Sequence, residues 1–455
     1  MNCMIGLDIG TSAVKAAILA ADGRVLQVTS EKFRYFGEDG ARLITVEDYC
    51  AACFSAIRRL ADSVGEEYTV TAICSCGASG NLILLDGENR PLTPIIGWQS
   101  AAPEEDCDAF FSAEEKAAFH RLVGWPFSNH FPVAWLCSIN LHHKMLLEQT
   151  QTVAMSIEYL NFLLTGKWGI SHSMGTPFFL IDQEKSEYSL PLLKKLGIAD
   201  KQLPPIYDKG TVLGTVTPEM AEQLHLSPDA VVVLGSFDHP SGALGAGVLH
   251  EGDMLLSCGT SWVELFPVAS REFALSTGGL VDRFMLNGAP YCVMKSVTSL
   301  SELIDNLRRL YFGDITLRDF DKLVEQGEPG CGGLTFTFTE ADRTAGYGFT
   351  SPQIARAIIE AAANKLKENL SELRQCGLRA DRIVAIGGIT NSRECMDVIS
   401  QLLELPIRVI NGQSAGAVGS CLLAGVAMNF FESEDAAFDT MYAAQSENVK
   451  PSTGA

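Results

Sequence analysis

The stretch over residues 231–261 restricts the fold of this chain more than any other part of it. Its first residues, 231–234, form a short apolar run between turn residues, which predicts a buried β-strand. Asp238 follows this strand, and a helix built of small residues is expected over 240–247. Ligands bind at the carboxyl ends of the strands in open α/β sheets. The stretch therefore predicts an α/β domain with Asp238 at its ligand-binding edge.

The same stretch continues with an expected strand over 254–258, which leads into the turn Gly259-Thr260-Ser261. Such a turn presents backbone N–H groups and two hydroxyl groups, which suit phosphate oxygens. The beginning of the chain repeats this arrangement. A strand over 4–9 carries Asp8, the turn Gly10-Thr11-Ser12 follows, and a second apolar strand comes next. The repetition indicates two similar domains that face one cleft.

Chain length and charge limit the architecture and the partners. A chain of 455 residues is too long for one hydrophobic core, so two domains are expected. Prolines and turns concentrate between 201 and 229, which predicts domains over 1–229 and 230–455. The net charge of −21 argues against non-specific binding to nucleic acid or to anionic membranes. An anionic ligand is therefore expected to be bound by local N–H groups and a metal ion.

The chain begins directly with a strand, so no signal peptide is expected. The thirteen cysteines show no disulfide framework and indicate buried free thiols in the cytoplasm, including the pair Cys50 and Cys53, which has CxxC spacing within an expected helix. The uncharged stretch over 412–431 contains small and polar residues, which favour a buried helix over a membrane span.

Alternating periodicities predict α/β structure along most of the chain. Two of the expected strands are followed by glycine-rich turns: Ser79-Gly80 after 69–76, which either faces a ligand or simply links two strands, and Gly387-Gly388 after 382–386. Further expected elements are helices over 45–64, 104–123, 131–149 and 351–374 and a strand over 334–338.

Two carboxylates and three glycine-containing turns together suggest phosphoryl transfer. Asp8 can hold Mg²⁺, Asp238 can accept a proton from an attacking hydroxyl, and the turns can bind phosphate groups. Each feature alone has a plainer interpretation. A Gly-Thr-Ser turn can be purely structural, and Asp238 can cap the helix that follows it. The glycines of 242–247 fall within a helix, so close packing explains them better than dinucleotide binding, and the chain has no P-loop motif.

Four motifs, in order and spacing, resemble the FGGY carbohydrate kinases, in the branch that contains the xylulokinases. They are IGLDIGTSAVKAAI at the start, SIEYLNFLLTGKW in the middle, GSFDHPSGALGAGV with LLSCGTSW after it, and IVAIGGITNS with LLELPI near the end. The resemblance extends from residue 4 to about 430. It implies a two-domain actin-like ATPase (ribonuclease H-like) α/β fold with an interdomain cleft.

The resemblance also implies roles for individual residues. Asp238 would be the general base for a sugar hydroxyl, and Asp8 with Asp238 would hold Mg²⁺. ATP would be bound by the turns and the residues after them, namely Gly10, Thr11, Ser12, Gly259, Thr260, Ser261, Gly387, Gly388 and Asn391. The sugar would contact Ser79, Gly80, Trp98 and Asp238.

The sugar side departs from the pattern of the family. The family usually shows Trp-x-Asp-x-Arg, whereas this chain continues from Trp98 with Gln99-Ser100-Ala101-Ala102. Many members carry a Met-His or Arg-Glu pair where this chain has Ser79-Gly80. The nucleotide half is therefore expected to be intact and the sugar half altered.

The expected function is ATP- and Mg²⁺-dependent phosphorylation of a hydroxyl on a small sugar or polyol, with a ketose as one candidate, in the cytoplasm. A homodimer is one possible oligomeric state of the protein. One alternative is a nucleotide-binding regulator with lost or altered sugar kinase activity, and another is an actin-like or chaperone-type ATPase. Neither alternative explains a carboxylate at residue 238 followed by a helix of small residues.

Overall fold

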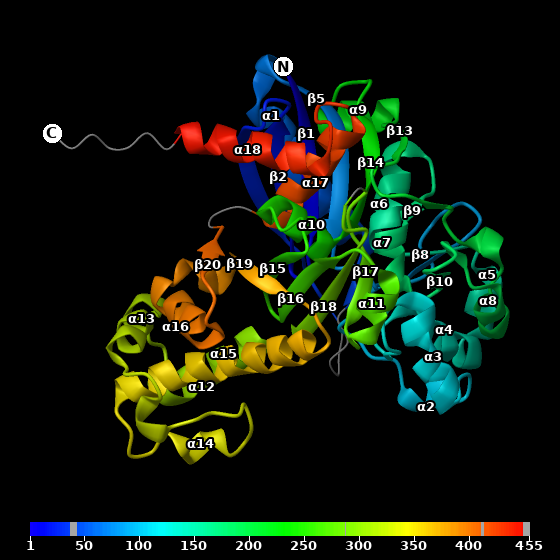
Figure 1. Ribbon diagram of the computed structural model, residues 1–455. Helices are drawn as coiled ribbons and strands as arrows, with labels where there is room; N and C mark the ends of the chain where they lie inside the picture. Colours follow the sequence, from blue (N-terminus) through cyan, green and yellow to red (C-terminus); the bar gives the residue numbers. More distant parts are fainter. Residues whose placement is uncertain (37–42, 287, 411–413, 449–455) are drawn as a thin grey trace. The chain divides into compact units, whose positions relative to one another are not determined.

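The computed structural model describes residues 1–36, 43–286, 288–410 and 414–448 (Figure 1). Their contacts divide the chain into two compact units. Unit 1 consists of residues 1–247, 280–287 and 414–455, and unit 2 consists of residues 248–279 and 288–413. Each unit is built around one mixed β-sheet.

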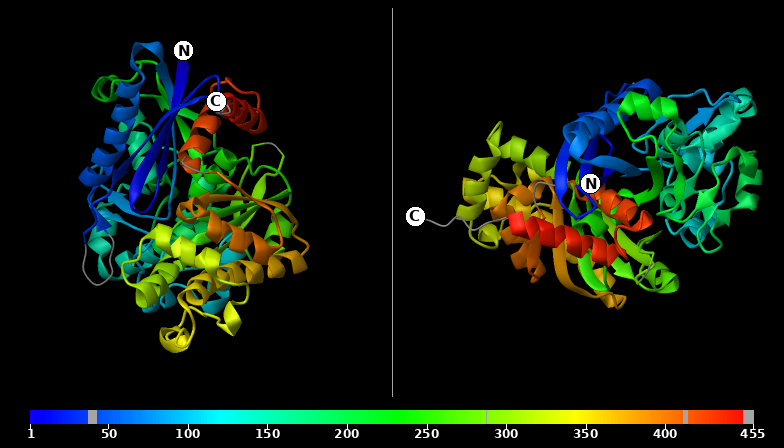
Figure 2. Two further views of the ribbon diagram at one scale, coloured as in Figure 1. Left: turned by 90° about the vertical axis from the view of Figure 1, so that its left-hand side faces the viewer. Right: turned by 90° about the horizontal axis from the view of Figure 1, so that it is seen from above.

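The sheet of unit 1 has the strand order β13-β14-β5-β1-β2-β3. Strands β1, β5 and β14 are parallel, and β2 and β3 continue antiparallel from β1. Helix α17 covers one face of this sheet and α1 covers the other (Figure 2). The principal elements are β1 (Asn2–Ile9), β2 (Ala13–Ala20), β3 (Val25–Lys32), α1 (Val46–Ser63), β5 (Thr69–Gly77), β13 (Val212–Thr215), β14 (Val231–Phe237), α10 (Asp238–Ala246), α17 (Ala415–Ala427) and α18 (Glu434–Asn448).

Shorter elements complete the residue ranges of unit 1. They are β4 (Leu43–Ile44), η1 (Gly65–Glu67), β6 (Ile83–Leu85), β7 (Ile95–Ile96), α2 (Glu104–Asp108), α3 (Ala113–Val123), α4 (Pro132–His142), α5 (Lys144–Gln149), β8 (Thr152–Ala154), α6 (Ser156–Thr165), β9 (Ile170–Ser171), α7 (His172–Gly175), η2 (Thr176–Phe178), β10 (Ile181–Asp182), β11 (Glu187–Tyr188), α8 (Leu190–Leu196), η3 (Asp200–Gln202), β12 (Ile206–Tyr207), α9 (Pro218–Leu224) and β17 (Leu280–Arg283).

Unit 2 repeats the central pattern of unit 1. The five strands that fall within the residue ranges of unit 2 have the order β18-β16-β15-β19-β20, with β15, β19 and β20 parallel and β16 and β18 antiparallel to their neighbours. The elements are β15 (Gly252–Cys258), β16 (Trp262–Val268), α11 (Arg271–Ser276), β18 (Tyr291–Val297), α12 (Leu300–Phe312), α13 (Leu317–Gln326), η4 (Cys331–Gly333), α14 (Asp342–Ala345), α15 (Ser351–Gln375), β19 (Ala380–Gly387), η5 (Gly388–Asn391), α16 (Arg393–Leu403) and β20 (Ile407–Val409). The duplication inferred from the two Gly-Thr-Ser turns is thus present in the sheets.

The two units differ from the sequence ranges 1–229 and 230–455. Strand β14 lies between β13 and β5, so Asp238 at its end belongs to unit 1. The carboxyl-terminal helices α17 and α18 also return to unit 1. A domain boundary predicted from local composition could not include this return. The contacts involved join residues more than 400 positions apart, such as Cys421, whose Sγ donates to the carbonyl oxygen of Met4.

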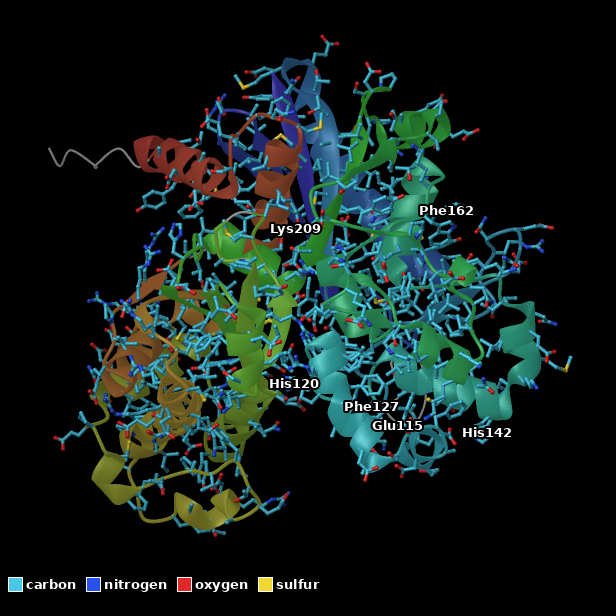
Figure 3. All side chains as sticks on the ribbon, turned by 45° about the vertical axis from the view of Figure 1, so that its right-hand side comes forward. Glu115, His120, Phe127, His142, Phe162 and Lys209 are labelled. Carbon is cyan, nitrogen blue, oxygen red and sulfur yellow. The ribbon has the colours of Figure 1, made fainter. Side chains whose placement is uncertain are left out.

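A buried ion pair attaches helix α18 to the rest of unit 1. Lys209 Nζ lies 2.9 Å from the carboxylate of Glu434, whose side chain is 1 % exposed. The same carboxylate accepts a hydrogen bond from the backbone N–H of Leu286. Figure 3 labels Lys209 within unit 1. Both charges are paired, as buried charges must be.

Helices α10 and α17 pack closely because both present small residues at their contact. Ser241 Oγ donates to the carbonyl oxygen of Gly416, and a Cβ atom on Gly419 would collide with the carbonyl oxygen of Ser241. Gly245 serves the same helix packing, since a Cβ on it would collide with the carbonyl oxygen of Ala415, whereas Gly247 ends α10 with a positive φ of 70°. The uncharged stretch at 412–431 likewise contains the buried helix α17. No described helix is both long and apolar enough to cross a bilayer.

We expect Gly419→Ala to destabilise unit 1, because the new methyl group meets backbone that cannot rotate away. The expected loss is about 1–3 kcal/mol of unfolding free energy. The measurement is the urea midpoint, compared with Gly87→Ala, where a Cβ would meet nothing within 4 Å. Equal midpoints for the two variants would contradict the close approach of α10 and α17.

The expected strand over 334–338 is wrong. These residues are irregular, and Phe338 has a positive φ of 59°. The carboxylate of Asp342 accepts hydrogen bonds from the backbone N–H groups of Thr337 and Thr339. A side chain therefore satisfies the donors that a β-ladder would have used, and the alternation of Thr and Phe misled the prediction.

Two expected helices are each divided in two. The 104–123 segment forms α2 and α3, separated because Ser112 begins α3 with a capping box. The 131–149 segment forms α4 and α5, which meet at the non-helical His143. By contrast, α1 begins as predicted, since the Thr45 side chain accepts from the backbone N–H of Asp48. All thirteen cysteines are free and all but Cys376 are buried, as expected for unpaired thiols.

Glu264 on β16 is fully buried. Burial raises the pKa of this carboxyl to about 8, although the side chains of Asn369 and Lys295 oppose the shift. The folded state therefore binds a proton that the unfolded state releases. Its stabilising contribution is complete below the ordinary glutamate pKa and is lost as the pH rises through about 8.

We expect Glu264→Gln to match the wild type at low pH and to be more stable at pH ~9, by on the order of a few kcal/mol. Urea unfolding at both pH values checks this. Glu368→Gln, which changes an exposed carboxylate on α15, is the control. A Gln variant that keeps the wild-type loss of stability at high pH would contradict the assignment.

Candidate active site

The carboxyl ends of three parallel strands bring the candidate residues of unit 1 to one edge of the sheet. Strand β1 ends at Ile9 and leads into Gly10-Thr11-Ser12. Its neighbour β5 ends at Gly77 and leads to Ser79-Gly80, and β14 on the other side of β5 leads directly into Asp238. The register pairs Asp8 with Cys76 and Phe237 with Gly77, so these strand ends are level. This edge is where open α/β sheets bind ligands.

Asp8 lies partly exposed near the end of β1. Ser414 Oγ donates to Asp8 Oδ2 at 3.3 Å. The carboxyl group packs against Gly416 of α17, where a Cβ atom would lie only 2.8 Å from Asp8 Cγ. Gly416 therefore leaves the room that the Asp8 side chain occupies.

The charge of Asp238 acts on Asp8. Burial, and after it the charge of Asp238, raises the pKa of Asp8 to about 6. Lys15, which pairs with Asp8 across the β1–β2 hairpin, opposes the shift. Two carboxylates that repel each other form a set of oxygen donors that a divalent cation would neutralise.

Asp238 is the first residue of α10, and its side chain is 24 % exposed. Its Oδ1 accepts a hydrogen bond from the N–H of the next residue, His239, at 2.7 Å. No side-chain cap occurs at the preceding residue, Phe237. The carboxylate thus lies at the positive end of the helix, and the bond from His239 N–H uses Oδ1. The partly exposed side chain leaves Oδ2 accessible to a ligand.

The first Gly-Thr-Ser turn is tied to the predicted sugar side. Trp98 Nε1 donates to Thr11 Oγ1 at 3.2 Å, and the Tyr35 hydroxyl donates to the carbonyl oxygen of Thr11. His130 Nδ1 lies 3.1 Å from the carbonyl oxygen of Trp98. A small cavity of about 30 Å³ beside this turn is lined by Thr11, Trp98 and Gln99, among others. Trp98 and Thr11, predicted for different ligands, are therefore direct neighbours.

The Ser79-Gly80 turn is buried and closely packed. Ser79 Oγ donates to the carbonyl oxygen of Met174 at 3.5 Å. Gly80 has φ of 86°, and a Cβ there would lie 2.7 Å from the ring of Phe131. Both residues are at the predicted edge, but these contacts equally fit a structural turn.

The second Gly-Thr-Ser turn and the Gly387-Gly388 turn lie at one edge of the sheet of unit 2. Strands β15 and β19 are parallel, and Cys258 pairs with Gly387 where they end. Gly387 has φ of 110°, and a Cβ on it would collide with the carbonyl oxygen of Cys258. This edge repeats the arrangement of Ile9 and Gly77 in unit 1, where a Cβ on Gly77 would collide with the carbonyl oxygen of Ile9.

Backbone and hydroxyl groups shape the turns of unit 2. Ser301 at the start of α12 donates from Oγ to the carbonyl oxygen of Gly259 and from N–H to that of Thr260. Ser261 Oγ accepts from the N–H of Ser299. In the other turn, Asn391 Nδ2 donates to the carbonyl oxygen of Gly388. Gly259, Thr260, Gly387, Gly388 and Asn391 are all exposed.

The structure thus assembles two groups of predicted residues, one in each unit. Unit 1 brings together Asp8, Asp238, the first Gly-Thr-Ser turn, Ser79-Gly80 and Trp98, and unit 2 brings together the other turns. Among the described residues, no cluster of three or more His, Cys, Asp or Glu side chains is arranged to hold a metal ion. Asp8 and Asp238 remain a pair of carboxylates.

Sequence reasoning missed three residues around Asp8. Ser414, Gly416 and His239 carried no signal of their own, although His239 lies next to the predicted base. Lys15 could have been placed from the short turn, because a hairpin that pairs Ile9 with Val14 also pairs Asp8 with Lys15.

The chain matches two family descriptions. "FGGY family of carbohydrate kinases, N-terminal domain" matches residues 3–245, which is more than half of the chain, and the C-terminal domain of that family matches residues 333–428. Among curated relatives, xylulose kinase from Staphylococcus epidermidis strain RP62A is 23% identical and covers 94% of this chain and 88% of its own. L-fuculokinase from Salmonella typhi is 23% identical, with coverage of 96% and 94%.

Solved structures share the fold. Xylulose kinase from Lactobacillus acidophilus superposes with a TM-score of 0.84 at 20% identity and covers 98% of both chains. Gluconate kinase from the same organism gives a TM-score of 0.83 at 20% identity over 98% of this chain and 97% of its own. Glycerol kinase from Plasmodium falciparum, solved with ADP, gives 0.84 at 16% identity over 97% and 92%.

Proposed function

Because this chain belongs to the FGGY family of carbohydrate kinases, we propose that it transfers the γ-phosphoryl group of ATP to a hydroxyl of a small sugar or polyol, with Asp238 as the general base. The observation that supports this assignment most strongly is the position of Asp238. Its partly exposed carboxylate begins a helix at the carboxyl edge of the sheet, level with the first Gly-Thr-Ser turn and beside Asp8.

The reaction needs one proton transfer by this chain. Asp238 accepts the proton of the substrate hydroxyl as that oxygen attacks the γ-phosphorus, and the bond from the γ-phosphorus to the β–γ bridging oxygen breaks to release ADP. A carboxylate suits this task because its oxygens can accept a proton and because, at a helix N-terminus, it is held in one orientation. The bond from His239 N–H fixes one carboxylate oxygen.

Asp8 and Asp238 would hold Mg²⁺, directly or through water. The fit rests on their chemistry, since two mutually repelling carboxylates with the hydroxyl of Ser414 beside them offer the hard oxygen donors that Mg²⁺ prefers. When bound, the ion supplies charge neutralisation for the phosphate oxygens. Lys15, opposite Asp8, adds a positive charge at the same edge.

ATP binding is assigned to the turns of both units. Gly10, Thr11 and Ser12 in unit 1 and Gly259, Thr260 and Ser261 in unit 2 would contact phosphate groups through backbone N–H and hydroxyl donors. Gly387, Gly388 and Asn391 would contact the adenosine. The exposure of Gly259, Thr260, Gly387, Gly388 and Asn391 supports the part of this assignment that lies in unit 2.

The sugar is assigned to the edge formed by Ser79, Gly80, Trp98 and Asp238. A ketose is the first candidate, because the curated relatives at 23% identity include xylulose and fuculose kinases. A regulator without activity is not favoured, because it would not need an accessible carboxylate at residue 238. Free buried thiols support a reducing compartment, and we place the reaction in the cytoplasm.

A coupled ADP-release assay with Mg²⁺ and ATP tests the function. The acceptors are D-xylulose, L-fuculose, glycerol and gluconate, each taken from the name of a relative or neighbour. We expect turnover that depends on one of these or on a related ketose or polyol. ADP release that no acceptor of a wider panel increases would contradict the proposal and favour a sugar-independent ATPase.

A further inference from the structure

The backbone just before Asp238 is held by a side chain in addition to the sheet, in which Phe237 pairs with Gly77. The ladder between β14 and β5 shifts register between Leu234 and Phe237. The N–H of Phe237 donates to Ser173 Oγ at 3.0 Å. Ser173 belongs to the short helix α7, which is distant in sequence and 1 % exposed at this residue. The orientation of the Asp238 backbone therefore depends on a hydroxyl group from another element.

A buried carboxyl group fixes that hydroxyl in turn. Ser173 Oγ donates to Asp282 Oδ2 at 2.8 Å, and Asp282 is fully buried on β17. The other oxygen, Oδ1, accepts from Thr176 Oγ1 at 2.7 Å and from the N–H of Arg283 at 2.8 Å. Because the Ser173 proton is directed at Asp282, a lone pair of Ser173 Oγ is left to face the N–H of Phe237.

The ring of Phe237 is fixed as well. It lies edge-on to Trp125, with 5.4 Å between ring centroids, and at the same centroid distance from His239. Phe237 is thus held at its side chain by aromatic packing and at its backbone by Ser173. Asp238, the next residue, inherits its position from both.

We propose that Ser173 and Asp282 are positioning residues for Asp238. Asp282 orients the Ser173 hydroxyl, this hydroxyl accepts from the N–H of Phe237, and the two hydrogen bonds together determine the position of the carboxylate at the start of α10. This inference rests on the proposed function, in which Asp238 is the general base. Neither residue touches the substrate. Both act through the backbone of Phe237, so their loss changes the rate of the chemical step more than nucleotide binding.

Burying the Asp282 carboxyl group costs free energy, because its charged form loses its hydration. Burial raises its pKa to about 7, although the hydroxyls of Thr176 and Ser173 and the nearby Lys209 lower it. Above its pKa the group is an acceptor only, so the assays below are run at pH ~8.5.

The test compares two hydroxyls on the same carboxyl group. Ser173→Ala removes the acceptor of the Phe237 N–H, whereas Thr176→Val removes the other hydroxyl partner of Asp282 and leaves Phe237 untouched. We expect Ser173→Ala to lower kcat by about 10- to 100-fold with KM for ATP within about twofold of wild type. Thr176→Val should keep kcat within about threefold. Equal kcat values for the two variants would overturn the proposal.

A second measurement needs no substrate and separates this inference from the proposed function. Hydrogen–deuterium exchange of the Phe237 amide, read by NMR or in a short peptide over 235–240, should be faster in Ser173→Ala and unchanged in Thr176→Val. If wild-type enzyme phosphorylates no sugar, the proposed function fails, while this exchange still decides whether Ser173 holds the backbone. Unchanged exchange in Ser173→Ala overturns the inference even if the enzyme is active.

Asp282→Asn keeps the size of the side chain and covers the case in which Ser173→Ala fails to fold. It should lower kcat less than Ser173→Ala, and the double variant should be no slower than Ser173→Ala alone, because the two residues act through one chain. Rate losses that multiply in the double variant would show independent roles and would contradict the chain from Asp282 to Phe237.

Discussion

Asp238→Asn should abolish sugar-dependent ADP release, with kcat reduced by about 10²- to 10⁴-fold or more, while ATP still binds. The amide keeps the size of the side chain and can still accept the hydrogen bond from His239 N–H, so the fold of unit 1 should not change. It cannot accept the hydroxyl proton. The loss therefore falls on the chemical step.

The measurement is the steady-state rate with the acceptor found in the panel, together with calorimetric titration of ATP. Asp62→Asn is the control, since it removes a carboxylate that is 51 % exposed and paired with His225 on the surface of unit 1. Wild-type turnover by Asp238→Asn would remove residue 238 from the role of base. Loss of ATP binding in that variant would instead indicate that the nucleotide site had been disturbed.

Asp8→Asn should have the second largest effect, because it removes one of the two carboxylates assigned to Mg²⁺. We expect the Mg²⁺ concentration that gives half-maximal activity to rise by about tenfold or more, with kcat reduced at every Mg²⁺ concentration. The side chain keeps its size, so its packing against Gly416 and its bond from Ser414 Oγ can remain.

A magnesium titration of the initial rate checks this result. Asp22→Asn, on the turn between β2 and β3, is the matched control because that carboxylate is exposed and bonds only to Arg24 in the described contacts. An Asp8→Asn enzyme with the wild-type magnesium dependence would take Asp8 out of the metal site. It would leave the role of Asp238 as base intact.

The sequence predicted the elements that local pattern determines. The apolar runs of β1, β5, β14, β15 and β19 and the capped helix α1 were predicted because strand and helix periodicity and a capping threonine are local signals. The motif order then identified the duplicated arrangement. Asp238 and Asp8 followed from that arrangement, since a residue at a strand end can be read from the sequence once the strand is known.

The parts that sequence could not supply depend on contacts between distant residues. Helix α17 returns to unit 1, so Ser414 and Gly416 meet Asp8 from the far end of the chain, and no local pattern announces that contact. The strand expected at 334–338 failed because one side chain, Asp342, satisfied the backbone donors there. Ser173 and Asp282 became visible only through the hydrogen bond to Phe237.

A crystal structure of the wild-type enzyme with Mg²⁺, the sugar and a non-hydrolysable ATP analogue would show whether Asp238 is the general base. We expect a carboxylate oxygen of Asp238 at about 2.6–3.2 Å from the hydroxyl oxygen that faces the γ-phosphorus. If that carboxylate points away from the sugar, or if another side chain lies at this distance from the reacting hydroxyl, Asp238 is not the base.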